Sequence, residues 1–81
     1  MSANASPVGC VGRITATGAV RPGRLGEVML AIRGGVEAFF AKDADGGEIG
    51  PYEPVVVVEY EPPRTVVVTR LPDTEAEELT Q

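Results

Sequence analysis

The sequence predicts an all-β domain in which five short strands close into a small barrel. Ten glycines and seven prolines among 81 residues make up about a fifth of the chain, a share typical of short strands joined by turns. Runs of apolar residues alternate with polar ones and end at turn residues, and no stretch has the period of an amphipathic helix. A chain of this length forms one domain with one modest core.

The first strand is expected over residues 11–20 (VGRITATGAV), where β-branched and small residues mix. Gly12 and Gly18 lie inside it, and such glycines mark a bend, a bulge or the close approach of another backbone. Residues 21–24 (RPGR) form the turn that follows, because proline fixes φ and glycine accepts a positive φ.

Residues 26–32 and 36–41 (VEAFFA) are expected to form a hairpin around Gly34 and Gly35. A two-residue turn at these glycines would place Glu37 on the apolar face and point its carboxylate at the core. A three-residue loop over residues 33–35 keeps Glu37 outside, so we predict that loop. It pairs Ile32 with Val36, Leu30 with Ala38 and Val28 with Phe40. The inward side chains are then Val28, Leu30, Ile32, Ala38 and Phe40, joined by Ile14.

Residues 42–53 form the longest loop, and two valine-rich strands follow over residues 55–60 and 65–70, joined by residues 61–64 (EPPR). Unbroken valine runs indicate burial on both faces or a bulge that switches the face midway. Which of Val55–Val58 and Val66–Val68 face inward stays open, because a four-residue turn and a bulge give opposite answers.

Five strands with apolar edges are expected to close on themselves, and the long first strand favours an OB-like barrel because it must curve to pair at both ends. The loop after the third strand replaces the helix that many OB-folds carry between strands three and four, since its glycines and aspartates disfavour a helix. The expected organisation is a flexible lead-in over residues 1–10, the barrel over 11–71 and a flexible acidic tail over 72–81.

Residues 11–71 carry an Arg-Pro-Gly turn at 21–23, a small residue at Ala38, the stretch Gly-Gly-Glu-Ile at 46–49 and valine-rich strands over 55–68. In these features the chain resembles the C-terminal OB-fold domain of the prokaryotic NfeD family. It departs from the family at residues 52–54, where a glycine usually precedes the fourth strand, and the membrane helices that commonly precede this domain are absent. The resemblance implies a protein-interaction module, cytoplasmic and recruited to the membrane, whose partners are stomatin- and flotillin-like membrane proteins.

Catalytic, cofactor and metal sites are not expected, so we predict that the domain is not an enzyme. The chain has no histidine, and its one cysteine, Cys10, cannot form an intramolecular disulfide or a thiolate cluster; the role of Cys10 stays open. Asp43, Asp45 and Glu48 surround two glycines as in a calcium loop, but the spacing lacks the twelfth-position ligand and the flanking helices. This segment is therefore read as a solvated turn.

Charge argues against the alternative function, an OB-fold that binds single-stranded nucleic acid. The net charge is −5, and residues 43–81 carry ten acidic side chains against two basic ones. Phosphate binding needs a basic surface, so we expect no nucleic-acid partner. The longest purely apolar run, at 55–58, falls far short of the roughly 20 residues that cross a bilayer.

The predicted hairpin register places Phe39 on the outer face of the barrel, opposite Met29. An exposed methionine and phenylalanine with charged residues around them are typical of a partner-binding surface, which could also mediate self-association. The alternative is that the loop covers this pair through Ile49 or Tyr52 and makes it part of the core. The predicted patch consists of Met29, Phe39, Ala31, Ala41, Arg33 and Glu37.

Overall fold

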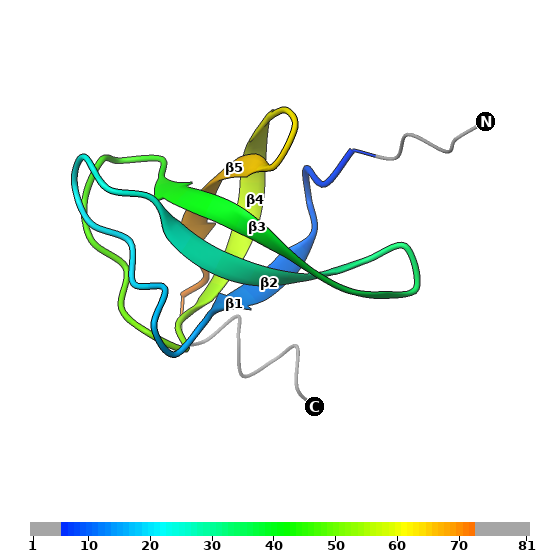
Figure 1. The fold of residues 1–81 in the computed structure, drawn as a ribbon, viewed down its shortest axis with the longest axis horizontal. Coiled ribbons are helices and arrows are strands. Elements are labelled where there is room, and N and C mark those ends of the chain that lie inside the picture. Colours follow the sequence, from blue (N-terminus) through cyan, green and yellow to red (C-terminus); the bar gives the residue numbers. More distant parts are fainter. Residues whose placement is uncertain (1–5, 73–81) are drawn as a thin grey trace.

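The computed structural model describes residues 6–72 and forms a closed barrel of five strands, in the order β1-β2-β3-β5-β4 (Figure 1). All neighbouring strands are antiparallel except β3 and β5, which are parallel. No helix occurs in the part of the chain that the structure describes, so the all-β, OB-like barrel without a helix between β3 and β4 is confirmed. The strands are β1 (Val11–Ile14), β2 (Gly26–Ile32), β3 (Gly35–Asp43), β4 (Pro54–Glu61) and β5 (Thr65–Arg70). The predicted tail beyond residue 72 and residues 1–5 of the predicted lead-in lie outside the described residues.

The core fills the inside of the barrel, and alternate side chains of β2 point into it, as the sequence pattern predicts. Two loop residues, Val20 and Ile49, complete it: each donates its backbone N–H to the carbonyl of the other, at 2.9 and 3.0 Å. The β1–β2 and β3–β4 loops therefore lie side by side at one end of the barrel (Figure 1). The core cluster is Ile14, Val20, Val28, Leu30, Ile32, Phe39, Ala41, Ile49, Val55, Val57, Val66 and Val68.

The first strand is shorter than predicted, because β1 ends at Ile14 and residues 15–19 leave the sheet. A turn lies here instead, in which the Gly18 N–H donates to the Thr15 carbonyl at 3.2 Å. The Gly18 carbonyl in turn accepts the backbone N–H of Glu27, and a Cβ on Gly18 would lie only 2.8 Å from that nitrogen. Gly12 has the same character, since a Cβ there would lie 2.1 Å from the carbonyl oxygen of Met29. Both glycines thus mark close backbone approaches, one of the roles that the sequence suggests.

The β2–β3 hairpin has a different turn from the one predicted. Its loop is the two-residue pair Arg33-Gly34, with φ of 54° and 77°, the two positive angles of a type I′ turn. This turn matches the right-handed twist of paired strands, and it pairs Leu30 with Glu37 and Val28 with Phe39. The predicted register is therefore wrong by one residue on β3. Phe39 is buried, with 3% of its surface exposed, and Phe40 is 54% exposed; Ala38 lies on the outer face with Phe40.

The valine-rich strands show both features that the sequence left open. The β4–β5 register shifts between Val57 and Glu59, so Val58 is an extra, exposed residue in a bulge. On β5, three consecutive valines, 66–68, are all buried. The turn that joins the two strands is residues 62–64, and the peptide bond between Pro62 and Pro63 is cis.

Candidate functional site

The outer side of the β2–β3 hairpin presents a row of exposed apolar side chains. Met29 lies opposite Ala38, and Ala31 lies opposite Val36. Val36 is 63% exposed and Met29 37% exposed, and both lie on the same side as Phe40 because side chains on a strand alternate between faces. We call this surface the outer face; it consists of Met29, Ala31, Val36, Ala38 and Phe40.

Of the six residues predicted for the binding patch, three are exposed, one (Glu37) is half-buried and two are buried. Met29 and Ala31 are exposed on the outer face, as expected. Phe39 and Ala41 are buried in the core, so their predicted exposure is wrong. The one-residue change of register replaces Phe39 by Phe40 and brings Val36 onto the same surface. The chain carried no independent signal for this, since either register gives one buried phenylalanine.

Arg33 and Glu37, the remaining two, form an ion pair of 2.9 Å at the end of the hairpin. The Arg64 guanidinium also lies 3.5 Å from the Glu37 carboxylate and 4.3 Å from the centre of the Phe39 ring. Hydrogen bonds from Arg33 lower the pKa of Glu37 below its usual value; burial opposes this effect, and the charges of Arg33 and Arg64 add to it. Glu37 therefore lies on the same side of β3 as the buried Phe39, and the positive charges of Arg33 and Arg64 compensate its negative charge.

The β3–β4 loop does not cover the outer face. Ile49 contributes to the main core beside Val20, and Tyr52 is exposed. Neither Ile49 nor Tyr52, the two side chains through which the loop could have covered this surface, lies over it. The outer face stays open to solvent within the part of the chain that the structure describes.

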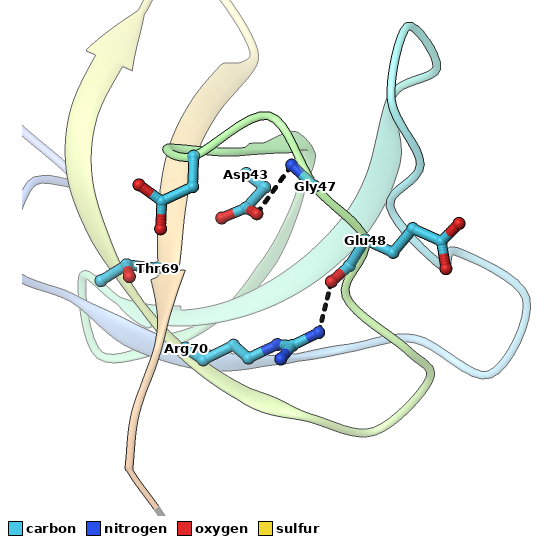
Figure 2. A pocket seen from close by; sticks show the side chains of 6 residues that line it. Asp43, Gly47, Glu48, Thr69 and Arg70 are labelled. Atoms are coloured by element: carbon cyan, nitrogen blue, oxygen red, sulfur yellow. Dashed lines mark hydrogen bonds between the residues drawn. The ribbon is translucent and has the colours of Figure 1, made fainter.

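The acidic segment of the β3–β4 loop is held by its own contacts (Figure 2). The Asp43 carboxylate accepts the backbone N–H of Gly47 at 3.0 Å, and Arg70 donates to the carbonyl oxygen of Glu48. Figure 2 shows the Glu48 carboxylate pointing away from Asp43. Within residues 6–72 no three His, Cys, Asp or Glu side chains gather as a metal ion would require. Cys10 is half-buried and packs against the core.

This architecture defines the class: a small OB-like β-barrel domain with an apolar surface on β2 and β3, the face that such barrels use for ligands. The chain belongs to the family described as the NfeD C-terminal domain, whose sequence model matches residues 11–69. Among the described residues, no helix is long and apolar enough to cross a membrane.

Two solved structures are similar to the chain. The soluble domain of the NfeD protein YuaF from Bacillus subtilis has 27% sequence identity and a TM-score of 0.64, covering 76% of this chain and 70% of that one. The C-terminal domain of stomatin operon partner protein 1510-C from Pyrococcus horikoshii has 25% identity and a TM-score of 0.65, covering 83% and 91% respectively. No curated protein sequence matches the chain.

Proposed function

We propose that this domain is a non-catalytic protein-interaction module whose outer face binds a stomatin- or flotillin-like membrane protein. The observation that carries the proposal is the row of exposed apolar side chains on β2 and β3, which nothing in residues 6–72 covers. Exposed methionine and aromatic side chains grouped on one surface are typical of sites that bind other proteins.

The choice of partner comes from the family relationship. The Pyrococcus horikoshii relative is described as a stomatin operon partner protein, so a stomatin-like protein is the first partner to test. Binding to such a protein would bring this domain to the cytoplasmic side of the membrane.

A protein partner fits the outer face better than nucleic acid does. Phe40 is its one aromatic residue, so the outer face offers a single ring on which a base could stack. Residues 6–72 carry seven basic and eight acidic side chains, so the barrel has no basic excess to attract phosphates.

The proposal is tested by removing apolar surface from the outer face without changing strand propensity. Met29→Gln with Val36→Thr should weaken binding to the purified stomatin-like protein of the same organism by about tenfold or more, since a few central apolar side chains dominate such interfaces. The melting temperature should stay within about 3 °C of the parent, because both side chains are exposed.

Val8→Thr with Val58→Thr is the matched control, because both valines are about half exposed and neither lies on β2 or β3. This control should bind the stomatin-like protein as the parent does. Equal binding by the outer-face variant and the parent would overturn the proposal.

A further inference from the structure

A groove of about 400 Å³ lies beside the outer face, between Phe40 and the β1–β2 loop. Gly18 and Gly26 form part of its lining, and they are in close backbone contact: a Cβ on Gly26 would lie 2.2 Å from the Gly18 carbonyl oxygen. The Glu27 N–H also donates to that oxygen at 2.8 Å. This part of the groove is therefore held by backbone contacts and is formed before any ligand arrives.

Leu25 and Phe40 supply the apolar part of the groove. Leu25 is 48% exposed and follows the turn at residues 21–24, in which Arg21 and Arg24 exchange backbone hydrogen bonds of 2.9 and 3.3 Å. Arg21, Arg24 and Leu25 all line the groove. A second hollow, of about 200 Å³, is lined by the same turn and by Lys42.

Arg21 and Arg24 differ from the other basic residues of the barrel. Arg33, Lys42, Arg64 and Arg70 form ion pairs, and Arg13 donates to the carbonyl oxygen of Tyr52. Among the basic side chains of residues 6–72, those of Arg21 and Arg24 are the two with neither an ion pair nor a hydrogen bond. Each guanidinium offers five N–H donors suited to a carboxylate.

Two carboxylates, those of Glu27 and Asp43, line the hollows beside this turn, and each accepts a hydrogen bond from a neutral donor. The Glu27 carboxylate accepts the Thr15 hydroxyl at 2.9 Å, and the Asp43 carboxylate accepts the Gly47 N–H. Both carboxylates keep their negative charge and offset part of the positive charge of the two arginines, but neither forms an ion pair with them, so the guanidinium N–H groups of Arg21 and Arg24 remain available to a ligand.

We infer that this groove binds an acidic segment of a protein partner, with an apolar side chain of that segment between Leu25 and Phe40 and its carboxylates on Arg21 and Arg24. The inference rests on the proposed function in that the ligand is a protein, and it adds the chemistry of the bound segment. Two arginines in a barrel without a basic excess complement a short acidic peptide better than a continuous phosphate backbone.

The test uses the full chain and a fluorescein-labelled synthetic peptide, EELLEDFEE, in a fluorescence anisotropy titration at about 50 mM salt. The parent should bind this peptide and should bind a version with Gln and Asn in place of the acids more weakly by about tenfold or more. Arg21→Gln with Arg24→Gln should weaken binding of the acidic peptide by a similar factor, and Leu25→Ser should weaken it as well.

Two control variants test whether the loss of binding comes from the positive charge at residues 21 and 24 and not from a change of charge elsewhere on the barrel. Arg21→Lys with Arg24→Lys keeps the charge but lacks the planar guanidinium, so it should bind the peptide more weakly than the parent and more tightly than the Arg21→Gln, Arg24→Gln variant. Val58→Glu lowers the net charge on β4, which contributes no residue to the groove, and should leave binding unchanged.

Several results would overturn the inference: equal binding by the Arg21→Gln, Arg24→Gln variant and the parent, equal binding of the uncharged peptide, or tighter binding of single-stranded oligo-dT than of the acidic peptide. A fourth is tighter peptide binding after Asp73→Asn, Glu75→Gln, Glu77→Gln and Glu78→Gln, which would make the chain's own acidic end the occupant.

The same variants separate this inference from the proposed function. If the groove variant loses the peptide while Met29→Gln with Val36→Thr still binds the stomatin-like protein, the inference holds and the proposed function fails. If the outer-face variant loses the stomatin-like protein while the groove variant keeps the peptide, the proposed function holds and the inference fails.

Discussion

Phe39 and Phe40 are consecutive residues in opposite environments, and the difference comes from the register of a single hairpin. Phe39 lies opposite Val28 inside the barrel, whereas Phe40 lies opposite Glu27 on its outer side. Phe39 also packs its ring under the Arg64 guanidinium. The identity of the buried phenylalanine therefore reports directly on the turn at Arg33-Gly34.

Phe39→Ala should destabilise the domain by about 3–5 kcal/mol, because it removes a buried ring and leaves a cavity. Phe40→Ala removes an exposed ring and should cost less than about 1 kcal/mol. Urea unfolding of the two variants measures both values. A larger loss for Phe40→Ala than for Phe39→Ala would restore the three-residue loop and contradict the structure.

The ion pair between Arg33 and Glu37 should make the stability of the fold depend on pH. Because the folded-state pKa of Glu37 lies below its usual value of 4.5, its charged form stabilises the fold above that pH. That stability is lost as the pH falls through the lowered pKa. Glu37→Gln should therefore be less stable than the parent at neutral pH, and the gap between their urea midpoints should narrow below about pH 4.5. A gap that stays constant through this range would contradict the assigned role.

Among the elements, β2 and its alternation were predictable from the sequence, whereas the register of β3 was not. Glycine is the residue expected at positive φ, so the pair Gly34-Gly35 attracts the turn in any reading of the sequence. The structure instead places Arg33 at φ of 54° and leaves Gly35 in the strand. A non-glycine residue at positive φ is uncommon, and no local sequence pattern indicates that Arg33 adopts one. The inward-facing valines of β4 and β5 could not be predicted for a different reason. Four consecutive valines show no alternation, so the sequence does not reveal that Val58 forms a bulge.

Gly12 lies where β1 and β2 are in close backbone contact, so a substitution there should test how these two strands pack. Gly12→Ala would place a methyl group 2.1 Å from the Met29 carbonyl oxygen, so the two strands must separate. We expect a loss of about 1–3 kcal/mol, as for other overpacked sites. Gly35→Ala is the control, because a Cβ there meets nothing within 4 Å; it should change stability by less than about 0.5 kcal/mol. Equal effects of the two changes on the urea midpoint would contradict the close approach at Gly12.

At the scale of the whole molecule, strand number and apolar edges were enough to predict a closed barrel, but not how one of its ends closes. The sequence suggested a long first strand that pairs at both ends. In the structure β1 ends at Ile14, and the bridge between Val20 and Ile49 joins two loops instead. Ile49 is one apolar residue in a polar loop, and its pairing with Val20 depends on a contact far along the chain. The outer face was predicted on the correct strands, and its composition changed with the register.

An amide chemical-shift titration of the full chain with the stomatin-like protein would show whether the outer face of β2 and β3 binds this partner. We expect shifts and line broadening to concentrate on residues 27–31 and 36–42, with little change on the exposed side of β4 and in the turn at 62–64. Perturbations confined to β4 and β5, with the β2–β3 amides unmoved at saturation, would contradict this expectation.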